Sequence, residues 1–147
     1  MTTSRRTTAA PLADFDEIVT ALRTAGHNVG ATRREVLAVV LARDGAFTAD
    51  DLAASLDDVH VSTIYRSLAL LEEIGVVDHV HLAHGPALYE RAAMAGTQQH
   101  LVCDVCGGHL SVPSAVFDEA RRSVEHDYGF ALGGGHFALT GRCADCR

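Results

Sequence analysis

HLVCDVCGGHL, from His100 to Leu110, holds a Cys-x-x-Cys pair in an otherwise apolar, strand-like setting. A second pair follows in GRCADCR, residues 141–147, and the sequence contains no other cysteine. Zinc takes four tetrahedral ligands, and each Cys-x-x-Cys pair presents two sulfurs on one tight turn. The pairs therefore predict a closed structural zinc site, which ties residues 141–147 to the start of a small domain. Its ligands are Cys103, Cys106, Cys143 and Cys146.

Two other uses of these cysteines are considered. The four residues could be two unrelated reduced or redox pairs, but a thioredoxin-like role needs only one pair, placed at a helix N-terminus after a strand. A zinc hydrolase needs an open coordination position and a nearby general base. The chain has no H-E-x-x-H motif, no Cys–His nucleophile pair and no Gly-rich phosphate loop. We therefore expect no enzymatic activity.

The composition limits the class of protein. A hydrophobic content of 48% over 147 residues is enough for a real core. No apolar run resembles a signal peptide or approaches the length of a membrane span, so we expect a cytoplasmic protein without membrane contact. The net charge of −7 argues against a non-specific nucleic-acid coat. All 12 basic residues are arginine, and a few placed arginines still allow sequence-specific DNA binding.

Residues 14–91 carry the pattern of a winged helix-turn-helix domain. Four amphipathic helices are expected within 14–26, 32–45, 48–56 and 61–75. Their predicted caps are Asp14, a box of Thr32 with Glu35, Thr48 and Ser62, and Gly26 and Gly75 end the first and last. The last helix presents Thr63, Arg66 and Ser67, with Tyr65 beside them, opposite its apolar face. An alternating strand over 76–82, a turn and a returning strand over 87–91 form the two-stranded wing.

The rest of the chain predicts a second, smaller unit, so the fold class is α+β. Residues 1–13 are read as a flexible tail and 92–99 as a hinge. Residues 100–147 then form a small α/β domain with strands at 100–103 and 109–112, a helix over about 114–127 and a last strand in HFALTG, 136–141. A unit of this size is marginal alone, and a metal or a dimer interface would stabilise it.

The helix VSTIYRSLALLEEIGVV, the wing and the two cysteine pairs, in this order, resemble the ferric uptake regulator family of metal-sensing bacterial repressors. The resemblance covers about residues 14–146. It implies a homodimer whose winged-helix domains read palindromic double-stranded DNA and whose C-terminal domains dimerise around a four-cysteine zinc. On the recognition helix it points to Ser62, Thr63, Tyr65 and Arg66 as DNA contacts. Arg33 and Arg34, at a helix start, suit backbone phosphates.

The family's usual sensor ligands are largely missing here. The His-rich run before the first cysteine pair is reduced to His100, Ala46 stands where a histidine is common, and Ser111 replaces an acidic ligand. Glu90 keeps the glutamate of the returning wing strand. The common iron, peroxide and zinc sensor sites therefore look dismantled.

Another histidine set remains. His79 and His81 alternate on the wing strand, so both rings point to one side. With His136 they resemble the nickel-responsive branch of the family, and this set is the predicted regulatory site, with His100 as an additional ligand. Asp78, His84 and Asp118 are weaker candidates. The second ion would be Ni²⁺, Zn²⁺ or Fe²⁺.

The predicted function is metal-responsive DNA binding that represses metal-homeostasis genes. Metal at the hinge would fix the spacing of two recognition helices and favour the DNA-binding dimer. The alternatives are a regulator that binds DNA regardless of metal, and a protein-binding adaptor on the same fold.

Overall fold

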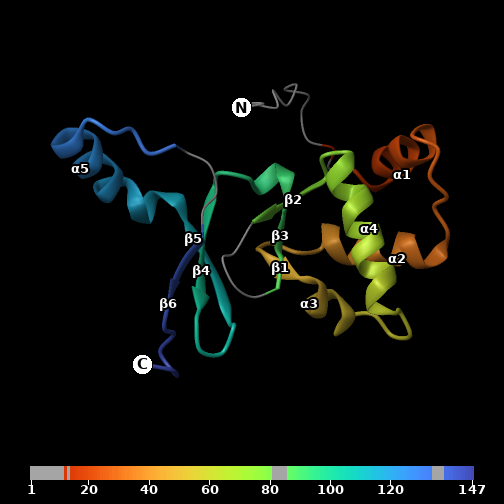
Figure 1. The fold of residues 1–147 in the computed structure, drawn as a ribbon. Helices are drawn as coiled ribbons and strands as arrows, with labels where there is room; N and C mark the ends of the chain where they lie inside the picture. Colours follow the sequence, from red (N-terminus) through yellow and green to blue (C-terminus); the bar gives the residue numbers. More distant parts are fainter. Residues whose placement is uncertain (1–11, 13, 81–85, 134–137) are drawn as a thin grey trace.

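The computed structural model describes residue 12 and residues 14–80, 86–133 and 138–147. Figure 1 shows two small sheets at the centre, with the helices α1 to α4 on one side and the helix α5 on the other. The helices are α1 (Phe15–Thr24), α2 (Ala31–Leu41), α3 (Ala49–Ala53), α4 (Val61–Glu73) and α5 (Asp118–Tyr128), with 3₁₀ turns η1 (Ala92–Met94) and η2 (Ser114–Phe117). The strands are β1 (Phe47–Thr48), β2 (Val77–Val80), β3 (Leu88–Arg91), β4 (Gln98–Cys103), β5 (His109–Pro113) and β6 (Ala138–Gly141).

Side-chain caps start two of the first three helices as predicted. Asp14 caps α1 by accepting hydrogen bonds from the amides of Asp16 and Glu17. Thr48 and Asp51 form a reciprocal capping box at α3. The predicted box of Thr32 with Glu35 is wrong: α2 begins at Ala31, so Thr32 already lies inside the helix. Gly30 caps α2 without any side-chain hydrogen bond.

The start of α4 also differs from the prediction. His60, not Ser62, is the N-cap residue, and its Nδ1 accepts a hydrogen bond of 3.2 Å from the Ser62 amide. The Ser62 hydroxyl lies 2.8 Å from the same nitrogen. Histidine is not a residue that N-cap preferences favour, which is why the pattern pointed to the serine two positions later. Gly75 follows the helix with a φ of +75°, as a helix stop requires.

The main core lies among α1, α2, α3 and α4 and the first sheet. That sheet has the order β1-β3-β2, and all its pairs are antiparallel. The wing strands β2 and β3 were predicted, but the two-residue β1, which pairs Phe47 with Tyr89, was not. A strand this short shows no alternation in sequence, so pattern reading could not find it. The winged helix-turn-helix architecture itself is confirmed.

The second sheet has the order β5-β4-β6. β4 pairs antiparallel with β5 and parallel with β6, with η2 and α5 in the connection. The segment predicted as a hinge, 92–99, contains η1 and the first two residues of β4. The predicted helix over 114–127 is a 3₁₀ turn followed by α5, which ends at Gly129 with a left-handed φ of +65°.

α5 buries none of its residues. In Figure 1 it extends away from the second sheet, on the side opposite α1 to α4. Among the described residues, no helix has the length and apolarity needed to cross a membrane.

Candidate metal centre and nucleic-acid interface

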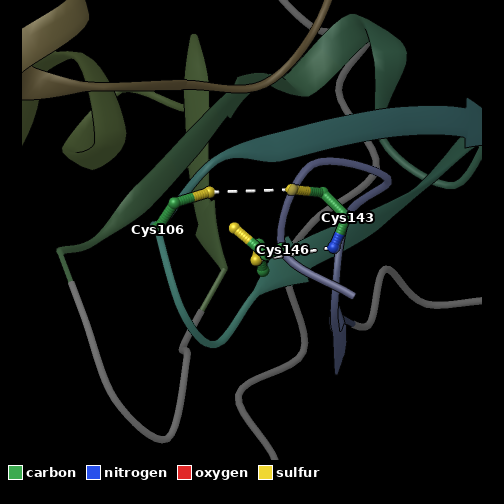
Figure 2. A group of neighbouring side chains, drawn as sticks. Cys106, Cys143 and Cys146 are labelled. Atoms are coloured by element: carbon green, nitrogen blue, oxygen red, sulfur yellow. Dashed lines mark hydrogen bonds between the residues drawn. The ribbon is translucent and has the colours of Figure 1, made fainter.

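The four cysteines come together at one end of the second sheet. β4 and β6 run parallel with Cys103 opposite Gly141, so the turns that follow the two strands lie side by side. The four sulfur atoms all lie within 4.8 Å of one another. Figure 2 shows Cys106 and Cys143 facing each other, with their sulfurs 3.8 Å apart. That separation is far beyond a disulfide bond, and all four cysteines are free.

Each pair sits on a tight turn closed by a backbone hydrogen bond. The Gly107 amide donates to the Cys103 carbonyl at 3.0 Å, and the Cys146 amide donates to the Cys143 carbonyl at 3.1 Å. Gly107 adopts a φ of +73°, which a side chain would disfavour. The Gly108 amide approaches the Cys106 sulfur at 3.4 Å. These turns aim four sulfurs at one point, and this donor set fits a structural zinc site.

Hydrogen bonding shifts the pKa values of two of the thiols in opposite directions. The Cys106 amide, followed by the amides of Cys143 and Val105, donates to the Cys103 sulfur and lowers the pKa of this thiol to about 6. Contacts with the Cys143 and Cys106 thiols raise the pKa of Cys146 to about 12. One sulfur is therefore ready to bind a cation at neutral pH, while another keeps its proton until a metal displaces it.

The predicted regulatory histidines are only partly within the described chain. His79 lies on β2, where its Nδ1 is hydrogen-bonded to Glu72 of α4 and its ring lies 6.2 Å from that of Tyr89. Three of the predicted ligands, His81, His84 and His136, lie outside the described residues. Within the described residues, the four cysteines are the one cluster of three or more potential metal-ligating groups.

The other candidates have partners of their own. Asp118 is exposed and forms an ion pair of 3.2 Å with Arg121, one turn further along α5. Asp78 lies opposite Glu90 in the β2–β3 register. His100 is fully buried, with its Nε2 3.0 Å from Glu90 and its Nδ1 3.2 Å from Ser111. These two pairings of His100, and the pairing of His79 with Glu72, could not be predicted from the sequence.

The candidate DNA-reading face of α4 is exposed in part. Tyr65 has 42% of its surface exposed, so it is not a core residue, and Arg66 is exposed beside it. Ser62 and Thr63 are half-buried near the start of the helix. Ser67, predicted on this face, is instead buried and donates a hydrogen bond of 2.9 Å to the Thr63 carbonyl. A small hydroxyl satisfied within its own helix can be buried at little cost.

The two arginines at the start of α2 already make contacts within the chain. Arg33 donates to the carbonyl of Asn28, and the guanidinium of Arg34 lies 5.0 Å from the centre of the Phe15 ring. Both side chains are half-buried. These contacts hold the guanidinium groups near the helix start, where predicted phosphate contacts would need them.

Comparisons with known proteins agree with this architecture. The profile of the Ferric uptake regulator family matches residues 24–138. The ferric uptake regulation protein of Vibrio parahaemolyticus is 28% identical over 130 residues, covering 85% of this chain and 87% of the relative. The peroxide-responsive repressor PerR of Staphylococcus saprophyticus is 24% identical over 137 residues, covering 90% and 91%.

Solved structures show the same fold. The ferric uptake regulator of Helicobacter pylori superposes with a TM-score of 0.69 at 18% identity, covering 94% of this chain and 97% of the other. That of Vibrio cholerae gives a TM-score of 0.63 at 25% identity, covering 84% and 98%.

Proposed function

Because the chain belongs to the ferric uptake regulator family, we propose that it is a metal-responsive, sequence-specific DNA-binding repressor of metal-homeostasis genes. The observation that carries the proposal is a winged helix joined to a sheet whose four cysteine sulfurs converge on one point. Regulators of this family act by binding DNA and metal, and they are not enzymes. The domain division proposed is 14–91 for DNA binding, 92–99 for the hinge and 100–147 for dimerisation.

The structural ion is Zn²⁺, bound by Cys103, Cys106, Cys143 and Cys146. Four thiolates form a closed tetrahedral set without a position for substrate, so the ion stabilises the fold and performs no chemistry. It links the turn after β4 to the turn after β6, two segments 37 residues apart between Cys106 and Cys143. A sheet with little apolar burial gains most from such a link.

The regulatory ion is bound by His79, His81 and His136. His79 supports this reading because its Nδ1 is hydrogen-bonded to a carboxylate, which is how proteins orient a metal-binding imidazole. The relatives reported above are named for ferric uptake and peroxide. Nickel therefore rests on the sequence motif, and Ni²⁺, Zn²⁺ and Fe²⁺ are all tested below. His100, the additional predicted ligand, is left out of this set because both of its ring nitrogens have protein partners.

The protein acts as a homodimer on a palindromic operator. Large apolar side chains are exposed on β5, β6 and the chain around α5, and a second copy would cover them. They include Leu110, Val116, Tyr128, Phe130 and Leu139, each more than 40% exposed. Two copies of α4 then present Tyr65 and Arg66 to half-sites one helical turn apart, with Ser62, Thr63, Arg33 and Arg34 contacting bases or phosphates.

The test is operator affinity with and without added metal. An operator is selected from random double-stranded DNA, and its binding is followed by fluorescence anisotropy in the presence of Ni²⁺, Zn²⁺ or Fe²⁺. We expect one ion to strengthen binding by at least tenfold and the His79→Ala, His81→Ala double variant to lose that gain. His126→Ala, on the exposed face of α5, is the matched control. Metal dependence that persists in the double variant contradicts the site.

A second candidate function is a regulator that binds the operator regardless of metal. It is favoured by His100, whose burial between Glu90 and Ser111 joins the two sheets through protein groups. Equal operator affinity with and without every ion tested would select this reading. No affinity for any selected DNA would select the adaptor.

A further inference from the structure

A chain of hydrogen bonds, buried at His100 and Glu90, runs between the first and the second sheet. The Ala46 amide, just before β1, lies 3.3 Å from the Ser111 hydroxyl of β5. The same hydroxyl lies 3.2 Å from Nδ1 of His100 on β4, and Nε2 of His100 lies 3.0 Å from Glu90 on β3. Both His100 and Glu90 are at most 1% exposed. The chain thus begins and ends on the first sheet and passes through two strands of the second.

Every step of the chain has a donor and an acceptor when His100 is neutral. The Ala46 N–H donates to the Ser111 oxygen, and the Ser111 O–H donates to an unprotonated Nδ1 of His100. The Nε2–H of His100 then donates to the Glu90 carboxylate. A neutral imidazole with its proton on Nε2 uses both ring nitrogens in this way. A buried carboxylate needs such a donor, because an unpaired buried charge is costly.

Other contacts hold the same junction. Nε2 of His109, on β5, lies 3.1 Å from the Ala46 carbonyl, so both backbone groups of Ala46 are bound by side chains of the second sheet. The same His109 nitrogen is 3.7 Å from Asp51 of α3. A small apolar cluster of Val80, Leu88 and Val102 packs beside the junction and includes Ala46 and Ala138 at its edge. A buried hydrogen bond, such as that between His100 and Glu90, is electrostatically stronger than an exposed one.

We propose that Ala46, Ser111, His100 and Glu90 form a metal-independent junction that fixes the winged-helix part of the chain against the second sheet. We name it the Ala46–Glu90 network. His100 acts in it as a positioning residue. It is not a metal ligand, because an ion on either ring nitrogen would have to break a hydrogen bond to Ser111 or to Glu90. Within the described chain, this junction also lacks a third histidine, cysteine or carboxylate placed to share an ion.

The network has a consequence for regulation. If the junction is set by protein groups, an ion bound by His79, His81 and His136 would act on two parts that are already joined, and would not assemble the two sheets. This goes beyond the proposed regulatory function and can be right or wrong independently of it.

The experiment uses full-length dimeric protein with its four-cysteine site loaded with zinc. Histidine ring nitrogens and backbone amides are followed by NMR while Zn²⁺ is added in excess. We expect the ring-nitrogen signals of His100 and the Ala46 amide shift to stay unchanged as the metal is added. A metal-induced change in either signal would overturn the proposal. Changes at His79 report on the wing site and leave this result unaffected.

A variant series tests whether the network holds the junction. We expect Ser111→Ala to speed hydrogen exchange of the Ala46 amide about tenfold, the effect of losing one hydrogen bond. Ser111→Thr keeps the hydroxyl and should restore most of the protection. Ser123→Ala, on the exposed side of α5, is the matched control. Wild-type exchange in folded Ser111→Ala would overturn the proposal.

Operator affinity separates the network from the sensor. Ser111→Ala and Glu90→Gln should weaken operator binding by the same factor with and without metal, because the junction acts in both states. A variant that instead changes only the ratio between the two conditions would show that the junction is part of the metal response, and would contradict its metal independence.

Discussion

The two halves of the chain are stabilised in opposite ways. Among the described residues, every buried hydrophobic side chain lies between α1 and β3 except Val102 and Cys103. The second half instead exposes large apolar groups, with Tyr128 80% and Phe130 63% accessible, and buries nothing on α5. The first half can fold by burying apolar surface, while the second depends on four sulfurs and on whatever covers its apolar side chains.

This contrast suggests a division of tasks. A region with a continuous core keeps the recognition helix rigid, and rigidity preserves the geometry that DNA reading needs. If the second half needs zinc and a second copy in order to fold, the proposed dimer would form from metal-loaded protein. The predictions below test whether each half fails in its own way.

The largest effect is expected from breaking the metal site. Cys143→Ser should abolish tight zinc binding and dimerisation, because structural zinc contributes on the order of 10 kcal/mol to folding of the domain that holds it. Elemental analysis and analytical ultracentrifugation measure the two losses. Hydrogen exchange of α1, α2 and α4 should stay close to wild type. Equal loss of protection in both halves would show that they fold as one unit.

The converse change is a cavity in the first half. Leu68 is fully buried on α4, and Leu68→Ala should lower the free energy of unfolding by about 2–5 kcal/mol. Val61→Ala, at a site 36% exposed on the same helix, is the control and should cost far less. Chemical denaturation followed by circular dichroism gives both values. Zinc content should stay at its wild-type level in both variants.

The pH dependence of zinc binding should report on the Cys103 thiol. The Cys103 pKa of about 6 lies below the ordinary thiol value, so its thiolate is favoured by the fold above that pH and protonates as the pH falls through 6. Below pH 6 zinc must displace one more proton than at pH 7. Each unit of pH below 6 should therefore lower the zinc affinity by about ten times more than a unit above 6 does. Competition with a chelating dye of known affinity measures it, and a constant slope would exclude this role for Cys103.

The smallest effect concerns the histidine cap of α4. His60→Ala should cost about 1 kcal/mol in unfolding free energy, because it leaves the Ser62 amide without its acceptor. His60→Asn supplies another acceptor and should restore most of the loss. Neither change should alter dimerisation. A cost for His60→Asn as large as that for His60→Ala would show that the ring acts by packing and not by capping.

Much of the fold followed from the sequence because its signals were local. Apolar periodicity placed α1 and α4, Asp14 and Thr48 marked helix starts, and Cys-x-x-Cys spacing identified the four sulfurs before their positions were known. A metal-binding pair whose two residues lie on one turn can be recognised from the sequence alone. The strand order of the second sheet and its parallel β4–β6 pair could not be predicted, because they depend on contacts between residues far apart in the chain.

The site was harder to predict for the same reason. Ala46 and Ser111 stand at positions where the family pattern has sensor ligands, yet here they lie at one end of a hydrogen-bonded chain that reaches the buried His100. A sequence shows what a position lacks relative to a family, but not which neighbour its remaining backbone or hydroxyl group will meet. The role of His60 as a cap was missed because histidine is not a favoured N-cap residue. The pairing of Glu72 with His79 was missed because it has no characteristic spacing.

The parallel pairing of β4 with β6 also orders events during synthesis. β4 and the turn after it emerge from the ribosome with Cys103 and Cys106, two of the four cysteines, and the partner strand β6 follows only after α5 has been made. The first half can reach its packed state during this interval, since translation proceeds at about 5–20 residues per second and domains fold as they emerge. The proposed zinc site would therefore be completed only after Cys146 has been made, when the helices and strands of the first half have already been synthesised.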